Sequence, residues 1–163
     1  MMANVRQPAL RSGSFPSPLG RAAIAFAGAF WAVSLVEALS FLFMASLHVG
    51  ARIPLGFTVV TDVRIVQATV AEAICGVLLL VASGALLAQR SWAWVFAAAT
   101  QAFSVAVVLN GMTRVGPGPD SQLNETYHLV IVTLLALGFL ALMLPPVHHA
   151  FRVGSADNQT NQM

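Results

Sequence analysis

The chain has 163 residues, of which 58% are hydrophobic and 9% are charged, and its formal net charge is +2. Soluble domains average about 25% charged residues, so this composition and a mean hydropathy of +0.79 exclude an ordinary water-soluble fold. The basic residues are arginines dispersed one at a time, which excludes the basic stripe that a nucleic-acid-binding protein needs. The single cysteine, Cys75, excludes a disulfide framework within one chain.

Four long apolar stretches predict an all-α integral membrane protein folded as an antiparallel four-helix bundle. About 20 apolar residues are enough to cross the hydrocarbon core of a bilayer as a helix. Residues 1–20, which are rich in Pro, Ser and Gly, are predicted to form a flexible cytoplasmic tail. The membrane domain is predicted at 21–147 and a second polar cytoplasmic tail at 148–163. The predicted spans are 22–47, 65–88, 92–112 and 128–144.

The connections between the spans predict how the helices are arranged. The connection Gln-Arg-Ser at 89–91 is so short that the second and third helices must be antiparallel neighbours. The longer connections, at 51–63 and 113–127, should lie together at the opposite end. In the second of these we expect Asn124 or Thr126 to cap the fourth helix.

Arginine positions predict the orientation, because cytoplasmic loops carry an excess of basic residues. A cytoplasmic N-terminus places five arginines inside, namely Arg6, Arg11, Arg21, Arg90 and Arg152, and three outside, namely Arg52, Arg64 and Arg114. The absence of lysine and the abundance of alanine indicate a GC-rich bacterial genome. We therefore expect a multi-pass protein of the bacterial inner membrane with both termini in the cytoplasm.

The polar residues inside the spans are predicted to form one buried layer. Measured from predicted outer ends at His48, Arg64, Gly111 and His128, three polar residues lie at similar depths, namely Glu37 at about 16 Å, Glu72 at about 12 Å and Gln101 at about 15 Å. Gly138 lies about 15 Å deep and would leave space for them. A charged side chain at the centre of a span costs roughly 2.5–3.5 kcal/mol, so each glutamate needs a partner or a proton.

This layer has two interpretations. Buried polar side chains that hydrogen-bond one another can lock helices together. Ionisable residues in a membrane can instead mark a proton pathway or the polar anchor of a ligand site. We predict no catalytic residue, and the sequence leaves the choice between lock and site open.

A second polar cluster is predicted at the outer boundary of the membrane. Its members are His48, Asp62, Arg64, Asn110 and His128. Arg64 is excluded as a direct partner of Glu72, because the two lie about 12 Å apart along one helix. No motif has the spacing of metal ligands, so no metal is predicted.

The stretch AEAICGVLLLVASGALLAQRSWAWVFAAATQAF at 71–103 resembles the second and third helices of DoxX-like proteins, which are small four-helix bacterial membrane proteins. The matching positions single out Glu72, Gly76, Gly84 and Arg90. The resemblance implies an accessory membrane subunit, linked in some members to quinone-dependent sulfur oxidation or redox defence. It implies a quinone as a possible cofactor, and it transfers no catalytic residue.

Three functional hypotheses follow. The first is a non-catalytic accessory or structural subunit that contacts membrane lipids and a membrane-protein partner or a second copy of the chain. The second is a small proton-coupled transporter of lipophilic substrates that uses the membrane glutamates, although no inverted repeat is evident. The third is a quinone-linked redox subunit of the DoxX-like kind.

Overall fold

The computed structural model describes residues 18–88, 90–114 and 122–145. In chain order its elements are α1 (Pro18–His48), β1 (Ile53–Pro54), β2 (Val59–Val60), α2 (Val66–Leu87), α3 (Ala93–Arg114) and α4 (Gln122–Met143). Within these ranges the chain is mostly helical, and all four helices are long and apolar enough to cross a membrane. Of the tail predicted at 1–20, residues 18–20 instead begin α1. Residues 1–17 and the tail predicted at 148–163 lie outside the described residues.

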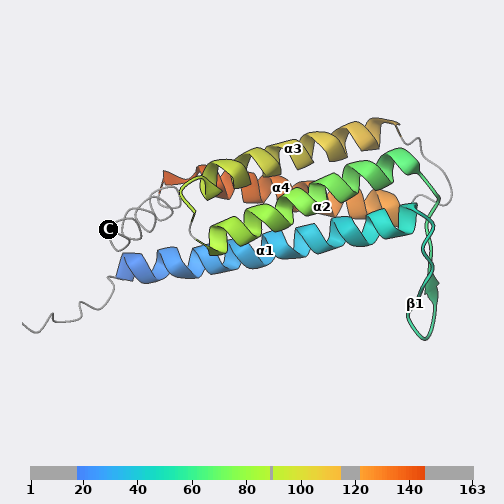
Figure 1. Ribbon diagram of the computed structural model, residues 1–163, viewed down its shortest axis with the longest axis horizontal. Coiled ribbons are helices and arrows are strands. Elements are labelled where there is room, and N and C mark those ends of the chain that lie inside the picture. The colour runs from blue at the N-terminus through green and yellow to red at the C-terminus, as the bar shows by residue number, and fades with distance from the viewer. Residues whose placement is uncertain (1–17, 89, 115–121, 146–163) are drawn as a thin grey trace, which may run out of the picture.

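The four helices lie side by side, and consecutive helices run in opposite directions along one long axis (Figure 1). Helix α1 packs along α2, α2 packs against α3, and α3 packs against α4. We call the end where α1 stops and α2 starts the His48 end, after the last residue of α1.

Apolar side chains cover the outward faces of the helices as well as the inward ones. Val36 on α1, Val70 on α2, Val95 on α3 and Leu137 on α4 are each more than half exposed. A helix that is apolar all round belongs in a core or in a membrane. The four helices therefore indicate a multi-pass membrane protein.

Small residues allow the closest helix contact, which joins α1 to α2. A Cβ atom placed on Gly76 would lie 2.7 Å from Leu42 Cγ and 3.1 Å from the backbone oxygen of Ala38. Only a residue without a side chain leaves room for α1 at that distance, as is common between membrane helices. Gly76 therefore sets the spacing of these two helices.

The boundaries of α4 differ from the prediction. The helix begins at Gln122 instead of His128, so Asn124 and Thr126 lie inside it. The predicted cap at either residue is therefore wrong. Asn124 is only 7% exposed, and its backbone oxygen accepts a 2.8 Å hydrogen bond from Nδ1 of His128.

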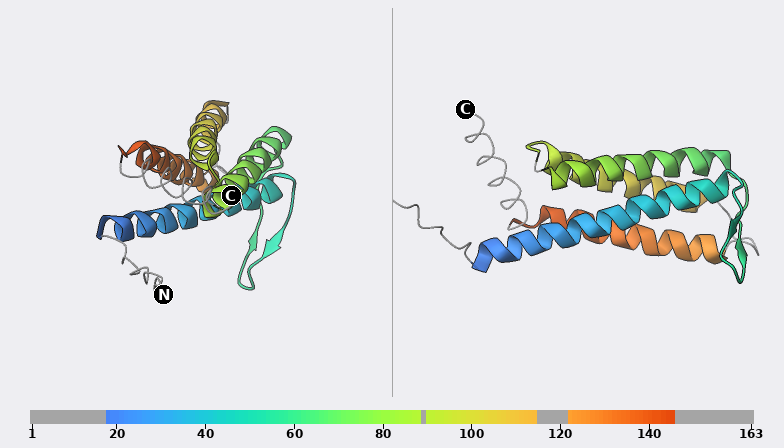
Figure 2. Two further views of the ribbon diagram at one scale, coloured as in Figure 1. Left: turned by 60° about the vertical axis from the view of Figure 1, so that its left-hand side comes forward. Right: turned by 60° about the horizontal axis from the view of Figure 1, so that its bottom comes forward.

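A short β-hairpin between α1 and α2 was not predicted. Its strands pair Ile53 with Val60 and Pro54 with Val59 in antiparallel register. Gly56, the first residue of the turn, has a φ of +83°, the kind of left-handed conformation that two-residue hairpin turns require. The hairpin leaves the His48 end and points across the helix axes to the side of α1 (Figures 1 and 2).

Candidate functional site

Four titratable side chains gather at the His48 end, and we call them the His48 cluster: His48, Asp62, Glu72 and His128. Nδ1 of His48 lies 2.7 Å from Oε2 of Glu72. On the other side of the ring, Nε2 of His48 lies 3.4 Å from Oδ2 of Asp62. Nε2 of His128 lies 3.9 Å from Oε1 of Glu72. One imidazole therefore sits between two carboxyl groups, and a second imidazole lies beside one of them.

The backbone at the end of α1 brings the loop back over His48. Gly50, just after the helix, has a φ of +102°, a conformation that glycine adopts readily, and it turns the chain away from α1. After the hairpin, the backbone N–H of Ile65 donates a 3.1 Å hydrogen bond to the carbonyl of His48. Oδ1 of Asp62 accepts a 2.7 Å hydrogen bond from the N–H of Val63. These bonds hold the Asp62 carboxyl group against the ring of His48.

The cluster is buried at its centre and reaches the surface at its edge. The His48 side chain is 0% exposed and that of Glu72 is 5% exposed, whereas Asp62 and His128 reach 9% and 14%. Tyr127 packs edge-on against the ring of His128, with ring centroids 5.3 Å apart. The cluster therefore approaches the surface through Asp62 and His128, while His48 and Glu72 stay inside.

The second polar group lies deeper along the helices, and we call it the Glu37–Gln101 pair. Nε2 of Gln101 donates a 2.7 Å hydrogen bond to Oε2 of Glu37 and lies 3.5 Å from Oγ of Ser34. Glu37 is 0% exposed and Gln101 is 1% exposed. A Cβ atom on Gly138 would lie 3.2 Å from Nε2 of Gln101. Helix α4 therefore packs against the pair at Gly138, which has no side chain. The pair therefore joins α1 to α3 under α4.

The structure does not bring Glu37, Glu72 and Gln101 together in one hydrogen-bonded layer. Glu72 bonds to His48, whereas Glu37 bonds to Gln101. The physical reason is the direction of the side chains, because each Cα–Cβ bond in a helix tilts toward the N-terminus of that helix. Helix α2 runs opposite to α1 and α3, so Glu72 leans toward the His48 end while Glu37 and Gln101 lean away from it. Depths calculated from the backbone alone omit this difference.

The structure brings together only three of the five residues predicted for the outer cluster. His48, Asp62 and His128 do lie together, but they surround Glu72, and His48 is fully buried. Arg64 and Asn110 are exposed. Oδ1 of Asn110 accepts a 3.2 Å hydrogen bond from Nε of Arg114 on its own helix instead.

Several oxygen atoms of the two polar groups are buried without a hydrogen-bond partner. They are Oε1 of Glu37, Oε1 of Gln101, Oε1 of Glu72 and Oδ2 of Asp62. The arginines whose side chains the structure describes, namely Arg52, Arg64, Arg90 and Arg114, are all exposed. Among the described side chains, the basic groups beside the Glu72 and Asp62 carboxyls are therefore imidazoles.

Across 18–88, 90–114 and 122–145, no three His, Cys, Asp or Glu side chains are grouped so that they could hold a metal ion. A groove of about 490 Å³ lies on α2 and α3, and its lining contains no member of either polar group. The lining residues are Val66, Gln67, Val70, Ala71, Ile74, Phe103 and Val107.

Comparison with known proteins gives no match: no family model fits the chain, and no curated protein or solved structure resembles it significantly. Over the residues that the structure describes, the fold defines a helical protein with four candidate membrane spans. The DoxX-like relationship and the quinone that it implies stay predictions.

Proposed function

We propose that this chain is a non-catalytic accessory or structural subunit of the bacterial inner membrane, with both termini in the cytoplasm. In this proposal the four helices form an antiparallel bundle inside the bilayer. The apolar outward faces of the helices support the bilayer placement, and the distribution of arginines supports the orientation.

One observation carries the subunit role: each buried glutamate bonds to a side chain of a different helix. Glu37 on α1 bonds to Gln101 on α3, and Glu72 on α2 bonds to His48 on α1. Hydrogen bonds between helices hold membrane bundles together, typically by about 0.6 kcal/mol each and by up to about 2 kcal/mol. The glutamates then lock the fold, and the outward apolar faces are left for lipids and a partner subunit.

A pull-down in mild detergent tests this role, with mass spectrometry of both the proteins and the lipophilic molecules that co-purify. We expect a membrane-protein partner, and we expect Glu37→Gln to retain it, because glutamine keeps an oxygen for the amide of Gln101. Purification of the wild-type chain without any protein partner, but with a bound lipophile, would contradict the proposal.

A second candidate function is proton-coupled transport of a lipophilic cation. The His48 cluster favours it, because two carboxyls and two imidazoles meet there with no arginine among the described side chains beside them. A membrane carboxyl group can exchange its proton for a cationic substrate.

Tetraphenylphosphonium is a suitable probe of this second candidate. Added to the purified protein in weakly buffered detergent, it should release protons from the wild type and not from Glu72→Gln. The matched control is Glu125→Gln, which removes an exposed carboxyl group near the same end of the helices. Absence of proton release from the wild type across a panel of lipophilic cations would rule out exchange at this cluster.

A further inference from the structure

The β-hairpin between α1 and α2 exposes its apolar side chains, whereas the acidic residue that follows it, Asp62, faces the protein interior. Phe57 in the turn is 89% exposed, Leu55 48% and Val59 53%. Asp62, the only charged residue between Arg52 and Arg64, faces His48 instead of solvent. A loop surrounded by water would present the opposite pattern, and an exposed apolar patch of this kind marks a contact surface.

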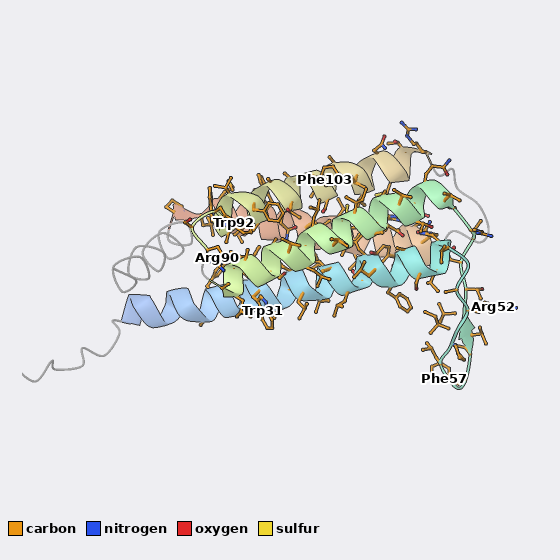
Figure 3. The ribbon with its side chains drawn as sticks, in the orientation of Figure 1. Trp31, Arg52, Phe57, Arg90, Trp92 and Phe103 are labelled. Carbon is orange, nitrogen blue, oxygen red and sulfur yellow. The ribbon has the colours of Figure 1, made fainter. Side chains whose placement is uncertain are left out.

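The direction of the hairpin places this surface at the level where the helices end. It leaves the His48 end at a steep angle to the helix axes and reaches past the side of α1 (Figures 1 and 2). Phe57 lies at its far tip (Figure 3). Phe43 and Val49, at the same end of α1, are exposed too. If the helices span a bilayer, the tip lies over the lipids that surround the bundle.

The charges beside the hairpin fit a lipid surface as well. Arg52 precedes β1 (Figure 3), Arg64 follows β2, and both residues are exposed. Guanidinium groups form strong paired hydrogen bonds with phosphate oxygens. Long basic side chains also extend readily from apolar surroundings to the headgroup level.

We propose that the hairpin tip, residues 55–59, inserts into the boundary between headgroups and acyl chains of the leaflet at the His48 end, with Arg52 and Arg64 at the phosphates. Partial insertion buries Phe57 and its apolar neighbours, as it does for amphipathic segments that lie in the interface. Because Asp62 lies only two residues after the end of β2, an anchored hairpin holds this carboxyl over His48. The inference rests on the membrane placement made under Proposed function.

Spin-label accessibility in proteoliposomes of phosphatidylcholine and phosphatidylglycerol tests the insertion. In the full chain carrying Cys75→Ala, single nitroxides are attached through Phe57→Cys, Val36→Cys and Glu125→Cys. Val36 is an exposed residue of the α1 span, and Glu125 is an exposed polar residue at the His48 end. Collision rates with oxygen, which concentrates in lipid, and with a water-soluble nickel chelate report the surroundings of each label.

We expect oxygen to exceed the nickel chelate several-fold at positions 57 and 36, and the reverse at 125. High nickel accessibility at position 57 places the hairpin in water and overturns the inference. Low accessibility to both reagents there places it under protein, either a partner or a second copy, and overturns it equally. Low oxygen accessibility at position 36 contradicts the membrane placement itself, so the two failures are distinguishable.

A second pair of variants tests whether apolar contact holds the tip in the lipid. With the label at Leu55→Cys, Phe57→Asp should raise nickel accessibility several-fold. Thr61→Asp adds the same charge at an exposed residue outside the tip and should leave the accessibility unchanged. An equal response to both charges would show that the tip is not inserted.

Discussion

The Glu37–Gln101 pair and the His48 cluster each bury a glutamate, but they give it different partners. In the pair, the carboxyl group accepts a hydrogen bond from an amide, which carries no charge at any ordinary pH. In the cluster, the carboxyl group lies against an imidazole, and a second carboxyl group and a second imidazole lie nearby. The two buried glutamates therefore differ in whether other ionisable side chains lie beside them.

The two groups also differ in how many elements they join. The pair connects α1 to α3. The cluster connects α1 to α2, and it also contacts the segment after the hairpin and the start of α4. Damage to the cluster should therefore cost more stability than damage to the pair, and the following variants measure that difference.

The largest effect is expected from His48→Ala. It removes the imidazole from between Glu72 and Asp62, and breaking a buried pair by removing one partner costs about 3 kcal/mol at the lower end of measured values. The free energy of unfolding can be measured by titrating sodium dodecyl sulfate into the protein in mixed micelles. His128→Ala is the control, because His128 lies 3.9 Å from Glu72 and is partly exposed. It should cost less than about 1 kcal/mol, and equal losses would show that His48 is not the centre of the cluster.

Gly76→Ala should produce the next largest loss. The new methyl group would meet Leu42 and the backbone of Ala38, next to Glu37, and overpacking of this kind costs about 2 kcal/mol. The matched control is Gly84→Ala on the same helix, where an added Cβ meets no atom within 4 Å. It should be neutral or stabilise the helix by up to about 1 kcal/mol.

Substitution of Gly76 also tests whether the two polar groups depend on the distance between α1 and α2. It lies one turn beyond Glu72 on α2 and faces the part of α1 that carries Glu37. If the spacing of α1 and α2 supports the contact between His48 and Glu72, the double variant Gly76→Ala/His48→Ala should lose less than the sum of the single variants. Additive losses would show that the cluster and the helix contact are independent.

The sequence predicts most of the helices and part of the polar arrangement. Depth along the helix brings Glu37 near Gln101 because α1 and α3 run in the same direction, so both side chains lean the same way. The same calculation fails for Glu72, since α2 runs in the opposite direction. Side-chain direction, added to the helical rise, would have separated Glu72 from the other two.

Two further features could not be read from local sequence. His48 stands at the end of an apolar run, which indicates a boundary, yet it is buried because Asp62 and the segment before α2 return over it. The hairpin strands have two residues each, too few for an alternating pattern to be recognised. The β-branched residues Ile53, Val59 and Val60 on either side of Gly56 were the available signal.

A smaller effect is expected at Glu37, and it distinguishes a lock from a proton site. Glu37→Gln keeps an acceptor for Nε2 of Gln101 and should change the free energy of unfolding by less than about 0.5 kcal/mol. Glu37→Leu removes the acceptor and should cost about 1 kcal/mol, as for other hydrogen bonds between membrane helices. The same detergent titration measures both. If Glu37→Gln lowers the free energy of unfolding as much as Glu37→Leu does, stability requires the carboxyl group itself. The pair would then depend on an ionisable group, as the His48 cluster does.

Ser34→Ala should have the smallest effect of the series. Oγ of Ser34 lies 3.5 Å from Nε2 of Gln101, beyond the usual range of an N–H···O hydrogen bond, whereas Glu37 lies 2.7 Å from the same nitrogen. Loss of so long a contact should cost less than about 0.5 kcal/mol, below the typical value of a complete hydrogen bond. The unfolding titration of Ser34→Ala beside Glu37→Leu gives the comparison. Equal losses would mean that the amide of Gln101 bonds to both Ser34 and Glu37 of α1. The deeper group would then be a network of three side chains instead of a pair.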